Sequence, residues 1–168
     1  MINLTADAFK PNMKLISVGI LFFLASCTGR GKKPNGDWLK GTEDEKIKTI
    51  EKHFRGLDNA MVETGYRYQE LYWAGKDQNW EYANYQVEKI RVAIEHALER
   101  RPLRAKSAQS FLSESIPSMK RSIASKDTSD FNSGFLVFTA SCNSCHAMEK
   151  VPFFNVVPPF ERLSPIRK

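Results

Sequence analysis

The sequence of residues 128–148 is TSDFNSGFLVFTASCNSCHAM. Its large apolar and sulfur-containing side chains recur every three or four residues, the spacing at which residues share one face of an α-helix. This stripe comprises Phe131, Phe135, Phe138, Cys142 and Cys145. Asp127, Thr128 and Ser129 lie at its start, where such residues favour a helix N-terminus. We therefore expect a helix from about 128 to 148 that turns its phenylalanines and both cysteines toward a core.

A longer helical stripe lies upstream, between residues 43 and 74. It comprises Ile47, Ile50, Phe54, Leu57, Met61, Thr64, Tyr68 and Leu71. Thr42 and Glu45 fit a capping box at its start, and Gly75 is well placed to end it. The pattern predicts one uninterrupted helix.

Two more stripes lie between these segments. One comprises Trp80, Ala83, Val87, Ile90, Ile94 and Ala97, with Asn79 as its N-cap and its end before Pro102. The other extends from about 105 to 125 and comprises Ala108, Leu112, Ile116, Met119 and Ile123. Pro117 lies inside this last helix, so we expect a kink there.

Four amphipathic helices with short linkers and almost no strand-like alternation predict an all-α fold. The linkers are too short for long crossovers, so we expect an antiparallel up-down-up-down four-helix bundle over residues 43–150. Gly134 lowers helix propensity, which indicates a close approach of two helices. Residues 151–168 form a Pro/aromatic tail that is too apolar for a free terminus, and we expect it to pack on the bundle.

The motif Cys142-Asn-Ser-Cys145-His146 is the C-x-x-C-H pattern of c-type haem attachment. Cysteines at i and i+3 share a helix face, so both thiols can reach the vinyl groups at one porphyrin edge while the histidine lies beneath the iron. We expect one covalent haem c, attached through Cys142 and Cys145 and ligated by His146. The alternatives are a redox dithiol, a zinc site or a disulfide. A redox dithiol usually lies in a βαβ unit, which is absent here. A zinc site would need a second Cys or His pair, and a disulfide between i and i+3 on a helix would be strained.

The N-terminal segment predicts export. Lys14 precedes an apolar run, 15–25, which is too short to span a bilayer and is typical of a secretory signal. The run ends in Leu-Ala-Ser-Cys27, which resembles the lipobox of bacterial lipoproteins. We expect a removable signal peptide over 1–26, a lipid on Cys27 and a flexible tether over 27–42. An ordinary signal peptide is the alternative, and both Met1 and Met13 are candidate initiators.

These features place the domain on the periplasmic side of a bacterial membrane, and Thr28 in place of aspartate favours the outer membrane. The net charge of +6 comes from basic residues spread along the chain, so we expect no nucleic-acid partner. No acid/base pair or phosphate-binding loop is apparent, and we expect no enzyme activity. A homodimer is left open.

A C-x-x-C-H motif on the last of four helices resembles the class II c-type cytochromes, the cytochrome c-prime family, over residues 43–150. Residues 71–83, LYWAGKDQNWEYA, also resemble a helix junction in bacterial haem-bundle proteins. The resemblance implies a four-helix bundle that holds one haem. The lipid anchor and the tail depart from the common pattern of the family, so its functions carry over only loosely.

Counting residues along the first and last predicted helices places His146 at roughly 27 Å and Met61 at roughly 21 Å from their shared end, and the two side chains lean toward each other. A His146/Met61 haem predicts electron transfer with a periplasmic redox partner. Met61 as simple core filling is the competing interpretation. Leu57 over the iron would leave a five-coordinate haem, as in typical cytochromes c-prime, and would favour binding of NO or CO. His53 and His96 are badly placed to bind the iron, and Met119 is less favoured than Met61. Met148 is excluded as a ligand because it lies two residues past His146 on the same helix. Arg100, Arg101 and Arg104 form a basic cluster that could pair with the haem propionates, although an exposed cluster that ends a helix is the favoured interpretation.

Overall fold

The computed structural model describes residues 36–163 and 165–166. The chain divides into two units, Met1–Lys46 and Ile47–Lys168. Every regular element among the described residues is helical, which confirms the all-α class. The elements are α2 (Glu43–Phe54), α3 (Leu57–Lys76), α4 (Trp80–Arg100), a 3₁₀ turn (Pro102–Arg104), α5 (Ala105–Ser110), a π-helical turn (Phe111–Ser115), α6 (Ile116–Ala124) and α7 (Thr128–Met148). The signal peptide and Cys27 lie outside the described residues.

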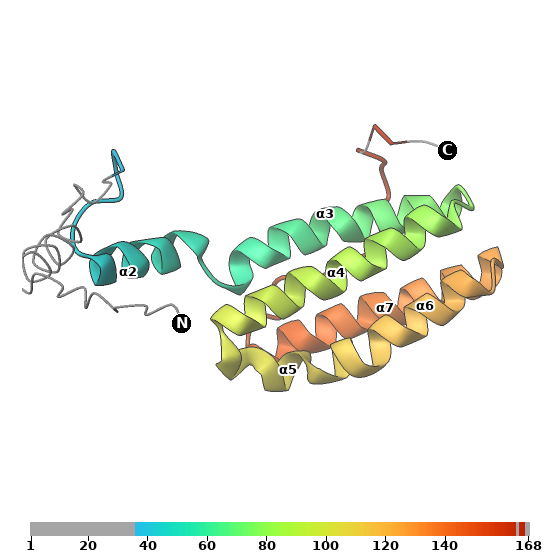
Figure 1. Ribbon diagram of the computed structural model, residues 1–168. Helices are drawn as coiled ribbons and strands as arrows, with labels where there is room; N and C mark the ends of the chain where they lie inside the picture. The colour runs from blue at the N-terminus through green and yellow to red at the C-terminus, as the bar shows by residue number, and fades with distance from the viewer. Residues whose placement is uncertain (1–35, 164, 167–168) are drawn as a thin grey trace, which may run out of the picture. The chain divides into compact units, whose positions relative to one another are not determined.

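Figure 1 shows α3, α4, α6 and α7 lying side by side as a helical bundle. Short turns, 77–79 and 125–127, join α3 to α4 and α6 to α7. Hydrogen bonds connect the helices: the Tyr68 and Thr139 hydroxyls lie 2.7 Å apart across α3 and α7, and Lys120 of α6 donates to Glu88 of α4 at 2.5 Å. The helices therefore share one core.

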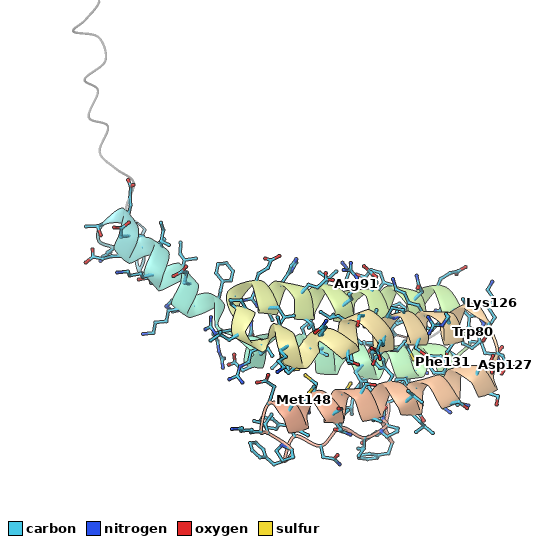
Figure 2. All side chains as sticks on the ribbon, turned by 90° about the horizontal axis from the view of Figure 1, so that it is seen from below. Trp80, Arg91, Lys126, Asp127, Phe131 and Met148 are labelled. Carbon is cyan, nitrogen blue, oxygen red and sulfur yellow. The ribbon has the colours of Figure 1, made fainter. Side chains whose placement is uncertain are left out.

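The core is centred on the aromatic stripe of α7. Phe131, Phe135 and Phe138 are each at most 1% exposed. The ring of Phe135 lies 4.8 Å from that of Tyr68, and the ring of Phe138 lies 5.0 Å from that of Phe111. Figure 2 shows Trp80 and Phe131 at the end of the bundle that holds the turn at Asp127, with Met148 at the opposite end.

The predicted long helix over 43–74 is wrong, because it is interrupted between α2 and α3. Arg55 adopts a left-handed conformation, with φ of 59°, and so ends α2. The Gly56 N–H then donates to Asp58 Oδ1 at 3.1 Å, beside the first turn of α3. Ile47 and Phe54 are 56% and 59% exposed, so the apolar stripe continues through α2 although, within the part of the chain that the structure describes, no core covers it.

Three predicted helix starts are confirmed by their capping hydrogen bonds. The Thr42 N–H donates to Glu45 Oε2 at 2.7 Å, and the Glu45 N–H donates to Thr42 Oγ1 at 3.3 Å. Asn79 Oδ1 accepts from the Tyr82 N–H at 3.3 Å. Asp127 Oδ1 accepts from the amides of residues 129 and 130 at 2.7 and 2.9 Å. These side chains satisfy amides that the helices leave without backbone partners.

Two glycines mark close packing. A Cβ at Gly134 would overlap Ser122, so the predicted close approach of α6 and α7 is confirmed. Gly75 does not end the helix, as the sequence suggested. It lies buried in the last turn of α3, where a Cβ would overlap the Phe131 ring, and the left-handed residue that follows this helix is Gln78, with φ of 55°.

The third rod of the bundle consists of α5, the π-helical turn and α6. Pro117 has no N–H to bond the carbonyl one turn back. A wider, π-helical turn, Phe111–Ser115, lies immediately before the helix that contains it. The Ile116 N–H bonds the Phe111 carbonyl, five residues back. The irregularity expected at Pro117 is thus a π-helical turn.

Candidate functional site

Cys142 and Cys145 lie in the last turns of α7, and both thiols are free. Cys142 is partly buried and packs against the bundle core. Cys145 lies within hydrogen-bonding reach of Ser107, at the start of the third rod. The i and i+3 spacing thus gives two thiols on the inner side of one helix.

Burial raises the pKa of the Cys142 thiol to about 12. Burial, followed by the nearby charge of Glu149, raises the pKa of the Cys145 thiol as well. Both thiols are therefore protonated at neutral pH. Redox-active dithiols depend on a lowered thiol pKa, so this environment is the opposite of an activated pair.

His146 follows directly and contacts the tail through its ring. Its Nδ1 lies 2.6 Å from the carbonyl oxygen of Phe154, and the two rings lie 6.4 Å apart. A carbonyl oxygen can only accept, so in the neutral imidazole this contact favours the proton on Nδ1 and the lone pair on Nε2. Nε2 is the nitrogen that a metal can bind.

The tail returns along α7 and is held by Asn143, within the motif. Asn143 Nδ2 donates to the Val156 carbonyl at 2.8 Å, and its Oδ1 accepts from the Val156 N–H at 2.7 Å. Val156 itself packs against the core. This role of Asn143 was not predicted from the sequence. The one indication was a hydrogen-bonding side chain between the two cysteines, in a helix that is followed by an apolar tail.

Glu149 connects the end of α7 to the third rod, and the sequence analysis missed this role. Its carboxylate accepts from Arg104 and from the Ser107 hydroxyl. Arg101 donates to the backbone carbonyl of Arg100 at 2.7 Å. Within this basic cluster, Arg104 is therefore engaged in an ion pair with the protein itself.

Met61 and Leu57 are partly buried on α3, and Met61 packs against the core. Met119 is buried beside Gly134, about 18 Å along α7 from His146 at 1.5 Å per residue. Met148 is 54% exposed. His53 and His96 are exposed. Of these side chains, Met61 combines a partly buried position against the core with a metal-binding atom near this end of the bundle.

Among the described residues, no three His, Cys, Asp or Glu side chains are grouped to hold a metal ion. No helix in this part of the chain is long and apolar enough to cross a membrane. A surface groove of about 480 Å³ lies between α4 and the third rod, lined by residues that include Leu98 and Leu112. Cys142, Cys145 and His146 do not line it.

The chain was compared with models of protein families, with curated proteins and with solved structures, and none of them matches it.

Proposed function

We propose that this protein is a monohaem c-type cytochrome that transfers electrons on the periplasmic side of a bacterial membrane. The observation that carries the proposal is the hydrogen bond of 2.6 Å from His146 Nδ1 to the Phe154 carbonyl. It leaves Nε2 free beside two thiols at the i and i+3 spacing, which is the donor set that a covalent haem requires. This contact is an observation that the sequence motif alone does not imply.

The chemistry of the two thiols fits covalent attachment. Each S–H would add across one vinyl C=C bond, which forms a C–S bond and transfers the hydrogen to carbon with no other reactant. A raised thiol pKa does not suit disulfide exchange, which needs a thiolate. When bound, haem supplies a one-electron iron(III)/iron(II) couple. The apolar core beside Cys142 would exclude water from that couple.

We further infer that the bundle is antiparallel, with the up-down-up-down order. Two hydrogen bonds between α3 and α7 support this direction, because the residue number rises in one helix as it falls in the other. They join Tyr68 to Thr139 at 2.7 Å and Lys76 to Asn132 at 2.8 Å.

This register favours Met61 over Leu57 as the sixth ligand. Met61 lies seven residues before Tyr68, and His146 lies seven residues after Thr139. Seven residues are about 10 Å along either helix, so the two side chains are level and each shares the face of its anchor residue. Leu57 lies about one turn farther along.

Optical spectra of the exported protein test this function. A His146/Met61 haem predicts a low-spin spectrum in both redox states and no change in the reduced protein under carbon monoxide. A high-spin ferric spectrum would contradict the electron-transfer assignment. Variant Leu57→Ala should show the same spectrum as the wild type, because this partly buried side chain is not the proposed ligand.

Binding of a diatomic gas is the second candidate. It is favoured by Thr64, whose buried hydroxyl has no hydrogen-bond partner and lies one turn from Met61 on α3. A hydroxyl in that position could donate to a ligand on an open iron. A carbon monoxide complex that forms readily in the reduced protein would support this function over the first.

We also propose that Cys27 carries a lipid that anchors the domain, with the outer membrane favoured by Thr28. Radiolabelled fatty acid should label the wild-type protein and not the Cys27→Ala variant. Separation of the two membranes should then place the labelled protein in the outer fraction. Label that persists in Cys27→Ala would refute the anchor and leave the haem proposal intact.

A further inference from the structure

Residues 150–162 form a segment that crosses the end of α7, and we call it the strap. Lys150 turns the chain with a φ of 62°, and the Val151 N–H bonds the His146 carbonyl at 2.9 Å. The Phe154 N–H then bonds the Val151 carbonyl at 3.0 Å. These bonds form two successive turns, which bring the Phe154 carbonyl back to the His146 ring.

Asn143 closes the strap on its other side. Its amide bonds both backbone groups of Val156, at 2.7 and 2.8 Å, as a neighbouring strand would. Val156 is two residues beyond Phe154, so the carbonyl that faces His146 is held between the turns and this clamp. A free tail would have to lose considerable conformational entropy to place one carbonyl so closely.

The far part of the strap is fixed to α3. Arg162 Nη1 donates to Asp77 Oδ1 at 3.0 Å, and its guanidinium lies 5.4 Å from the Trp73 ring centre. Asp77 is the C-cap residue of α3. The strap thus joins the end of α7 that carries the motif to the turn between α3 and α4.

We propose that Asn143 is a positioning residue that, through this strap, fixes the His146 tautomer and tunes the reduction potential of the metal bound at Nε2. That a metal is bound at Nε2 rests on the proposed function. An Nδ1–H bond to a carbonyl makes the imidazole a stronger donor, which stabilises the oxidised metal. Loss of the clamp should therefore shift the reduction potential to a more positive value.

The tautomer can be read without haem, by two-bond ¹H–¹⁵N spectra of the full chain labelled at histidine, at about pH 9, where imidazole is neutral. Wild type should show His146 protonated at Nδ1. Asn143→Ala should shift the population toward the Nε2–H form, and the exposed neighbour variant Ser144→Ala should not. Wild type protonated at Nε2, or an unchanged tautomer in Asn143→Ala, would overturn the proposal.

Two further readouts separate the strap from the haem assignment. In wild type, the Val156 amide should exchange slowly with deuterium, and rapid exchange would overturn the strap even if Asn143→Ala failed to fold. In the haem-loaded protein, the potential of Asn143→Ala should be more positive than that of Ser144→Ala. Equal potentials would overturn the tuning role, whereas a protein with the expected tautomer that attached no haem would refute only the proposed function.

Discussion

Met61 is the proposed sixth ligand of the haem iron, opposite His146. Variant Met61→Ala should convert a low-spin ferric spectrum to a high-spin one, because it removes the thioether sulfur that we propose as the sixth ligand. Variant Leu57→Ala should leave the spectrum unchanged. A low-spin spectrum in Met61→Ala would remove this residue from the coordination sphere.

Tyr68 gives the fold a dependence on alkaline pH. Its hydroxyl donates to Thr139 Oγ1, which in turn donates to the Phe135 carbonyl at 2.7 Å. Burial raises the pKa of Tyr68 to about 12, against about 10 in an unfolded chain. The unfolded state therefore loses this proton first, so the contribution of Tyr68 is complete below about pH 10 and is lost as the pH rises toward 12.

Tyr68→Phe should cost about 1 kcal/mol at neutral pH, because one hydrogen bond is lost and Thr139 keeps the other. The difference in unfolding free energy between variant and wild type should narrow between about pH 7 and about pH 11 in urea titrations. Tyr66→Phe, at a side chain that is 46% exposed, is the control. A difference that stayed constant with pH would contradict the role assigned to burial.

At the scale of the element, Gly134 tests the packing of α6 on α7. Gly134→Ala should destabilise the protein by about 1 to 3 kcal/mol, because the new Cβ overlaps Ser122. Gly65→Ala is the matched control: a Cβ there meets nothing within 4 Å, so helix propensity alone should stabilise by about 0.5 to 1 kcal/mol. Thermal or urea unfolding measures both. A Gly134→Ala variant with the stability of the wild type, or with the gain expected for Gly65→Ala, would refute the close approach.

Elements whose signals are local were predictable from the sequence. The bounds of α7 follow from the Asp127 cap and a phenylalanine stripe, and α4 begins at its Asn79 cap. The interruption at Arg55 was not predictable, because an apolar stripe has the same spacing whether or not a core covers it. Gly75 was misassigned for a related reason, since a glycine that ends a helix and one that admits a ring look alike in sequence.

The same distinction applies to the candidate site. Cys142, Cys145 and His146 were found from their spacing in the chain. Asn143 and the Phe154 carbonyl were missed, because their contacts depend on where the tail turns at Lys150 and returns along α7. Contacts between a helix and a segment without periodicity leave little trace in a sequence.

At the scale of the whole molecule, one end of the helical bundle brings together two protonated thiols, the His146 imidazole and the strap that holds that imidazole. The proposed function requires that haem be joined covalently to Cys142 and Cys145.

The most direct test is the intact mass of the denatured protein after export from a bacterium that performs cytochrome maturation. We expect a mass that exceeds that of the polypeptide by one haem, with red colour that survives denaturation. The double variant Cys142→Ser/Cys145→Ser should have the mass of the polypeptide alone. A colourless wild-type protein with no added mass would contradict the claim.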